Sequence, residues 1–182
     1  MAINKTKRKR RSDQQLKQVL TNLNRRIGKI KGATSEGLLD SAIDIYRRSQ
    51  SYCPVRISNL KASGHVMTLQ GPARQDGNFK GKNASEMESN HNAEMGSALN
   101  TIQNVSMKAG GGPVVGIGYT ALYALYVHET PTAGEVGYDP ARDAGKPAYK
   151  SHSEVGQWKF LQTAVEELRD DVIKNIKRRA KF

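Results

Sequence analysis

The chain has 182 residues, of which 37% are apolar, with a single cysteine and a net charge of +12. One cysteine excludes a disulfide within the chain, which is typical of a reducing compartment, and no apolar run approaches the roughly 18 residues that a membrane span needs. No apolar segment follows the basic N-terminal residues, so we expect neither a signal peptide nor a membrane partner. The length suits one domain with a buried core.

The positive charge is concentrated at the two ends of the chain. Residues 1–11 contain six cations and residues 174–182 contain five, with no acid in either range, and together they account for all but one unit of the net charge. Such ends favour nucleic acid or an acidic protein surface, and the alternative is that they are solvated tails that bind nothing. The candidate contacts to DNA or an acidic partner are Lys7, Arg8, Lys9, Arg10, Arg11, Lys177, Arg178 and Arg179.

The N-terminal half predicts helices followed by a strand. Residues 1–12 combine like charges with almost no apolar residue, so we expect a disordered basic arm ahead of a single domain over residues 13–182. Apolar residues at three- and four-residue steps predict helices over 13–31 and 34–53, or one long bent helix across Gly32. Pro54 ends the helix. Residues 65–69 read as a strand, and the polar segment 71–100 as a long loop with room for a short helix within 84–99.

The C-terminal half predicts two more strands and a closing helix. Residues 101–108 and 113–119 read as strands joined by a hairpin-type connection, and residues 121–129 as a short helix. A second long loop covers 130–156, and the final helix begins near Gln157. This order predicts an α+β fold, in which a small, mostly antiparallel sheet packs against long N-terminal and C-terminal helices, with long loop insertions at 71–100 and 130–156 and disordered basic ends.

No motif supports catalysis or cofactor binding. Gly116 to Ala121 approximates a dinucleotide fingerprint, but it lacks the βαβ context, and we interpret its glycines as sites where another chain segment approaches the strand closely. The pair His128-Glu129 lacks the second histidine of a zinc-protease helix. Cys53 stands at a helix end, where a small core residue is expected. We therefore expect no enzyme, no catalytic residue, no cofactor and no metal site.

Three tyrosines, Tyr119, Tyr123 and Tyr126, follow one another at helical spacing. Base stacking is one use of such rings beside basic ends. We favour a core or subunit contact, because the spacing places all three rings on one helical face.

Three short segments carry a resemblance to a known family. The corner Cys53-Pro-Val-Arg-Ile-Ser-Asn-Leu-Lys-Ala-Ser63 resembles a turn written A-P-V-x-T-G-N-L-x-x-S, with Ile57-Ser58 in place of the usual Thr-Gly. Tyr123-Ala-Leu-Tyr-Val-His-Glu-Thr130 is similar to Y-A-x-Y-V-E-x-G-T, although His128 precedes the Glu and the Gly is missing. Phe160-Leu-Gln-Thr-Ala164 is similar to F-L-x-x-A. These patterns are typical of the head–tail joining proteins of tailed bacteriophages similar to gene product 10 of phage HK97.

The resemblance covers residues 35–170 and implies a structural virion protein, either a minor capsid or a tail-completion protein. It would sit in the phage neck, between the portal side of the DNA-filled head and the tail, after assembly in the host cytoplasm. The implied partners are copies of itself in a ring of six or twelve, a portal-side adaptor or stopper, a tail-terminator protein, and packaged DNA by non-specific contact. The residues that match the motifs are Pro54, Val55, Ser58, Asn59, Leu60 and Ser63 in the corner, Tyr123, Ala124, Tyr126, Val127, Glu129 and Thr130 in the second segment, and Phe160, Leu161 and Ala164 in the closing helix.

The alternative hypothesis is a nucleic-acid-binding accessory protein that grips phosphates with its basic termini. Phosphate contacts carry no sequence information, whereas the distinctive residues of this chain lie in its body. The sequence therefore favours the neck protein.

Overall fold

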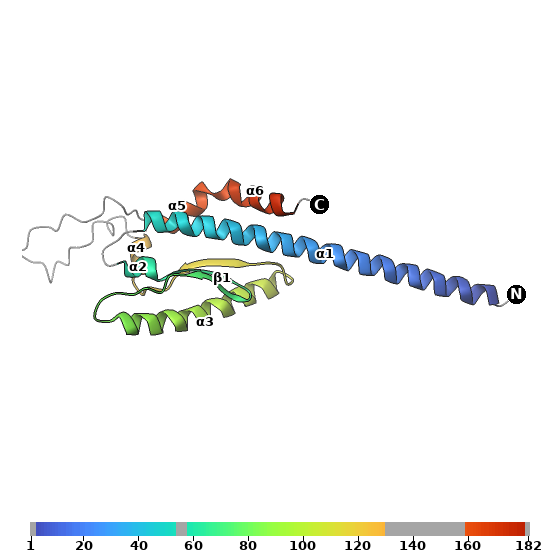
Figure 1. Ribbon diagram of the computed structural model, residues 1–182, viewed down its shortest axis with the longest axis horizontal. Helices are drawn as coiled ribbons and strands as arrows, with labels where there is room; N and C mark the ends of the chain where they lie inside the picture. The colour runs from blue at the N-terminus through green and yellow to red at the C-terminus, as the bar shows by residue number, and fades with distance from the viewer. Residues whose placement is uncertain (1–2, 54–57, 130–158, 181–182) are drawn as a thin grey trace, which may run out of the picture.

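The structure is a computed structural model that describes residues 3–53, 58–129 and 159–180, with side chains from residue 17 onward (Figure 1). Helices and strands follow one another in an α+β order, as predicted. The elements are α1 (Ile3–Tyr52), α2 (Asn59–Ala62), β1 (Gly64–Thr68), β2 (Gly71–Gln75), α3 (Ala84–Lys108), β3 (Val115–Tyr119), α4 (Ala124–Glu129), α5 (Phe160–Glu167) and α6 (Arg169–Arg179).

Helix α1 is one continuous helix of 50 residues. The two predicted helices are therefore fused across Gly32, which was the alternative reading of the pattern. The expectation of a disordered arm over residues 1–12 differs from the structure, because α1 already begins at Ile3. Lys, Arg and Gln are good helix formers, and adding a residue to an existing helix costs far less than starting one, so like charge does not interrupt the helix.

The sheet has three antiparallel strands in the order β2-β1-β3. The predicted strand at 65–69 is β1 and the one at 113–119 is β3, each within two residues. The predicted strand at 101–108 is wrong, because these residues form the last two turns of α3. The hairpin accordingly joins β1 to β2, where Thr68 faces Gly71.

Helix α3 and strand β2 replace the long loop that the sequence predicts over 71–100. The buried face of α3 consists of His91, Met95, Ile102 and Ser106. These residues recur at four- and seven-residue steps, which is helical periodicity, but two of the four are polar. A search for apolar stripes therefore misses the helix.

The sheet lies between α1 on one face and α3 on the other, and α6 packs against the side of α1 that faces away from the sheet (Figure 1). Neighbouring residues of a strand point to opposite faces, so Val66 packs with Ala42 and Tyr46 of α1. Met67 packs with Met95 and Ile102 of α3 on the other face. Strand β1 is thus covered on both faces, which explains why His65, Val66 and Met67 are all buried.

The closing helix is interrupted once, at Leu168, between α5 and α6. Its described part begins at Phe160, and the predicted loop insertion at 130–156 lies outside the described residues. Helices α5 and α6 run back along α1, since Glu167 contacts Arg48 while Arg179 contacts Asp40. The N-terminal part of α1 projects beyond the body (Figure 1).

Candidate functional site

The corner after α1 is fixed by backbone geometry and by one asparagine. Ser58 has a φ of 64°, a left-handed conformation that favours glycine, and its side chain makes no capping bond. Asn59 accepts a hydrogen bond from the Lys80 amide at 2.8 Å and donates one to the Lys80 carbonyl at 2.9 Å. The turn is therefore tied to the segment that precedes α3. Pro54 and Val55 lie outside the described residues.

All three motif segments meet in one apolar cluster. Leu60 from the corner, Ala124 from α4 and Phe160 from α5 pack with Cys53 at the end of α1. Ser63 is also buried and donates a hydrogen bond to the Leu60 carbonyl at 2.7 Å. Of the other motif residues, Val127 and Leu161 pack against this cluster, Ala164 is fully buried, and Thr130 lies outside the described residues.

Phe160 is the centre of this cluster. Its ring meets Tyr119 edge-on at 5.0 Å between centroids, and His128 at 5.2 Å. The Lys159 amide donates a hydrogen bond of 2.7 Å to the His128 carbonyl, which joins α5 to α4. One aromatic side chain thus connects the sheet, the short helix and the closing helix.

The tyrosines do not share one helical face, which corrects the sequence interpretation. Tyr119 belongs to β3, and its hydroxyl shares a hydrogen bond of 2.7 Å with the Ser49 hydroxyl. Burial raises the pKa of Tyr119 well above its usual value. Tyr123 and Tyr126, in contrast, are exposed at the surface. The interpretation as core holds for Tyr119, and a subunit contact for the other two stays a prediction.

The environment of Cys53, the single cysteine, does not favour a reactive thiol. Cys53 is fully buried, and burial raises the pKa of its thiol to about 12, so the reactive thiolate is scarce at neutral pH. His128 contacts Glu129 at 2.7 Å on the surface. The described residues contain no cluster of three or more side chains that could hold a metal ion.

The glycines of β3 allow close approach, as predicted. A Cβ at Gly116 would meet the Ile102 side chain at 3.0 Å, and one at Gly118 would meet the His65 ring at 2.9 Å. His65 lies 6.2 Å from the His91 ring, and Nδ1 of His91 is 2.6 Å from the Thr120 hydroxyl. Burial lowers the pKa of both histidines. Gly116 therefore allows α3 to pack closely on the sheet, and Gly118 leaves room for the His65 ring of the neighbouring strand β1.

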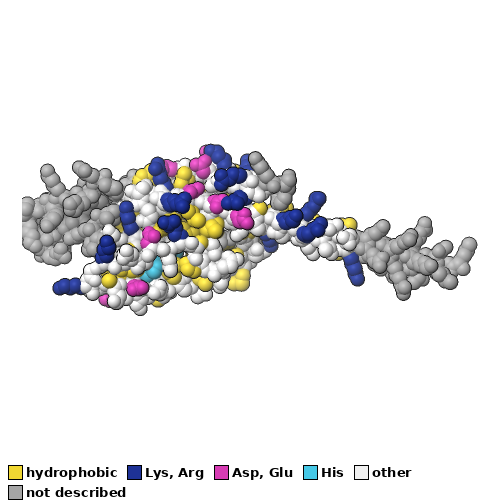
Figure 2. All heavy atoms as spheres, viewed as in Figure 1, with side chains coloured by type: hydrophobic (Ala, Val, Ile, Leu, Met, Phe, Trp, Pro, Cys, Tyr) yellow, Lys and Arg dark blue, Asp and Glu magenta, His cyan; other side chains and the backbone are white. Residues whose placement is uncertain are grey.

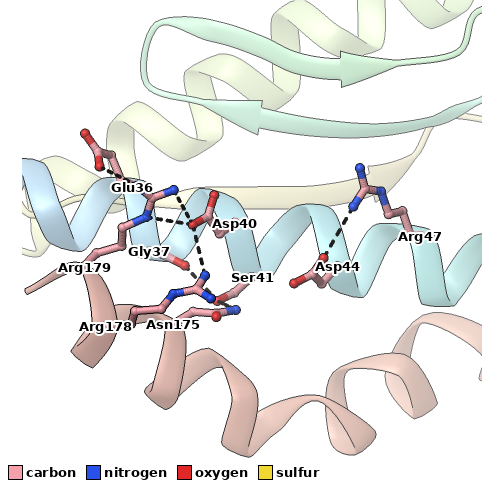
Figure 3. A network of polar contacts seen from close by, with 9 residues as sticks. All are labelled: Glu36, Gly37, Asp40, Ser41, Asp44, Arg47, Asn175, Arg178 and Arg179. Carbon is pink, nitrogen blue, oxygen red and sulfur yellow. Dashed lines mark hydrogen bonds and ion pairs between the residues drawn. The ribbon is translucent and has the colours of Figure 1, made fainter.

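Part of the C-terminal basic end is already paired within the chain (Figure 3). Arg179 contacts Asp40 at 2.9 Å and Glu36 at 3.5 Å, and Arg178 contacts Asp40 at 3.7 Å. Two of the three C-terminal cations proposed to contact DNA therefore hold α6 on α1. The side chains of residues 7–11 lie outside the described ones, and Lys177 lies in the last turn of α6.

Glycine makes this helix pairing close. A Cβ at Gly37 would lie 2.7 Å from the Ile176 Cα, so the two backbones touch. Asn175 also donates a hydrogen bond to the Ser41 hydroxyl at 3.2 Å. The sequence analysis did not predict this contact between α1 and α6. Two features of the sequence could have indicated it. Gly37 and Ser41 are small residues four positions apart on one helix face, and the neighbouring Glu36 and Asp40 complement the basic residues of the last helix.

Most of the large apolar side chains that are exposed on the described residues fall into two groups, and the others are Val105, Met107, Val165 and Ile173. The first, which we name the α1 stripe, lies on the projecting part of α1 and consists of Val19, Leu20, Leu23, Ile27 and Ile30. The second, which we name the α4 patch, consists of Leu122, Tyr123, Leu125 and Tyr126. The sequence identified these residues as apolar and periodic but gave no sign that the body leaves them uncovered.

Comparison with protein-family models, with curated proteins and with solved structures gives no match for this chain. Among the described residues, no helix combines the length and the apolarity that crossing a membrane requires.

Proposed function

We propose that the protein is a structural component of a bacteriophage neck, in which copies of it form part of the ring that joins head to tail. The observation that carries the proposal is the convergence of three separate motif segments on one cluster around Phe160. A second observation supports it. The motif places glycine at the position of Ser58, and this residue adopts the left-handed conformation that favours glycine.

The described surface suits a protein that acts through contacts. The α1 stripe and the α4 patch expose large apolar side chains at two separate places, and such surfaces are typical of interaction sites. A neck subunit contacts its own copies in the ring and also the proteins on either side of the ring, so it needs more than one contact surface. The neighbours in this proposal are the portal-side adaptor or stopper and the tail-terminator protein.

The nucleic-acid-binding alternative has one observation in its favour. The projecting part of α1 contains five cations and no acid over residues 14–35, in addition to the basic residues before it. Against it, Arg178 and Arg179 are engaged with acids of α1. Non-specific phosphate binding also gives no reason for the α1 stripe.

One experiment separates the two functions. The full chain and a variant that lacks residues 1–11 are compared by light scattering and by the anisotropy of a labelled DNA duplex at 50 and 200 mM salt. The neck function predicts that the deletion leaves the assembly state unchanged, while any DNA binding is weak and falls steeply with salt. Tight DNA binding that the deletion abolishes, by a protein that is monomeric at every concentration, would favour the alternative.

A further inference from the structure

The α1 stripe is an apolar surface on a helix that has left the body. Its five side chains are between 42% and 61% exposed, and the described residues of the body do not cover them (Figure 1). The stripe extends over about three helical turns. Removing each of its large apolar side chains from water would stabilise a complex. The stripe therefore needs an occupant.

The stripe continues the face of α1 on which α6 already lies. Leu23 and Ser41 are 18 residues apart in the sequence, which is five full turns at 3.6 residues per turn, so they share one face. Ser41 and Gly37 contact α6, and α6 ends at Arg179, beside Glu36. A helix thus covers the body end of this face, and beyond the end of α6 no described residue covers the same face.

The spacing of the stripe specifies a helical occupant. Leu20, Leu23, Ile27 and Ile30 follow one another at steps of three, four and three residues, which is the a/d pattern of a coiled-coil seam. Residues 17–31 contain no Trp, Phe or Tyr, whereas helices that lie on membranes use Trp and Phe besides Leu on the apolar face. A narrow aliphatic seam favours a second helix over a lipid surface.

The charges beside the seam indicate which charge the flanking residues of the partner helix carry. Residues 14–35 contain five cations and no acid, and Figure 2 shows basic side chains without acidic ones on the described part of the projection. Arg26 and Lys31 take g and e positions beside the seam, where parallel coiled coils pair charges between helices. A second copy of α1 would bring like charges together there. The cations are Lys17, Arg25, Arg26, Lys29 and Lys31.

We propose that the α1 stripe docks an amphipathic helix of another protein whose apolar seam is flanked by Asp and Glu. This is recognition of a helix by its apolar face, with charge setting the choice of partner and the rate of encounter. The inference rests on the exposed face and its charges and does not depend on the neck function.

The test uses the full chain and two synthetic helical peptides with the same leucine seam. One peptide carries Glu at its e and g positions and the other carries Lys. Binding is measured by the anisotropy of the labelled peptides, alongside binding to anionic phosphatidylglycerol vesicles. We expect the Glu peptide to bind at least about tenfold more tightly than the Lys peptide, a difference of about 1.4 kcal/mol. This preference should shrink in 1 M salt, where the Debye length is about 3 Å.

Two variants of α1 and one control locate the binding. Leu23→Gln with Ile27→Gln should weaken the Glu peptide at least about tenfold, since it removes two seam contacts. Arg26→Glu with Lys31→Glu should reverse the preference between the peptides. The control Ile173→Gln changes an equally exposed apolar residue on α6 and should leave binding unchanged. Circular dichroism of each variant verifies that the helix content is retained.

Four results would overturn the inference. The first is equal binding of both peptides, and the second is no binding of the Glu peptide at high micromolar concentration. The third is tighter binding to vesicles than to the Glu peptide. The fourth is self-association of the full chain that the Leu23 and Ile27 substitutions abolish, which would make a second copy the occupant.

Discussion

A matched pair of glycine substitutions on α1 tests how α6 is seated. In an exposed helix, replacing Gly by Ala stabilises by about 1 kcal/mol because Ala loses less backbone entropy. At Gly32 nothing lies within 4 Å of the new Cβ, so Gly32→Ala should raise the free energy of unfolding by that amount. At Gly37 the new Cβ would lie 2.7 Å from the Ile176 Cα and 3.1 Å from the Asn175 carbonyl oxygen.

These neighbours of Gly37 are backbone atoms, so a side-chain rotation cannot relieve the contact. Overpacking of this kind costs about 1–3 kcal/mol, which cancels or exceeds the gain in helix propensity. We therefore expect Gly37→Ala to be less stable than Gly32→Ala by about 1–3 kcal/mol. Urea denaturation followed by circular dichroism measures both, with unchanged m-values as a check on the two-state assumption. Equal stabilisation by the two substitutions would refute the close backbone contact between α6 and α1 at Gly37.

Three further predictions concern the corner and the sheet. Phe160→Ala should lower the free energy of unfolding in urea by about 3–5 kcal/mol, because the ring is 1% exposed; a loss below about 1 kcal/mol would contradict its central place. Asn59→Ala should cost about 1–3 kcal/mol and speed hydrogen exchange at the Lys80 amide, which loses its acceptor; unchanged exchange would argue against this bond. Burial lowers the pKa of His65 and His91 below 6.5, so the unfolded chain binds more protons than the folded one below about pH 6.5. The free energy of unfolding should therefore fall between pH 7 and pH 5, and a rise over this range would contradict the neutral, buried state of both rings.

The sequence predicts best the elements whose apolar residues repeat regularly. The helical period of Leu39, Ala42 and Tyr46 identifies α1, and the apolar residues of 65–69 and 113–119 identify β1 and β3. The sequence does not reveal α3 because its buried face includes two polar residues. His91 contacts Thr120, which is 29 residues away, and Ser106 donates a hydrogen bond to the Gly112 carbonyl beyond the end of the helix. Local periodicity carries no information about such partners.

The candidate site also has parts that the sequence predicts and parts that it does not. The motif residues Leu60, Ala124 and Phe160 are visible in the sequence, and the structure brings them into one cluster. Whether an apolar stripe is covered is a property of the whole fold, so the period of the α1 stripe predicts a helix but not its exposure. The pairing of Arg179 with Asp40 is likewise invisible, because 139 residues separate them.

The central claim is that this chain joins head to tail, and an image of an intact phage particle tests it most directly. The particle is produced with the chain carrying a small C-terminal label, and the position and copy number of the label are determined by electron microscopy. The account predicts six or twelve copies arranged as a ring at the junction between portal and tail. Particles that assemble and package DNA without any copy of the chain at that junction would contradict it.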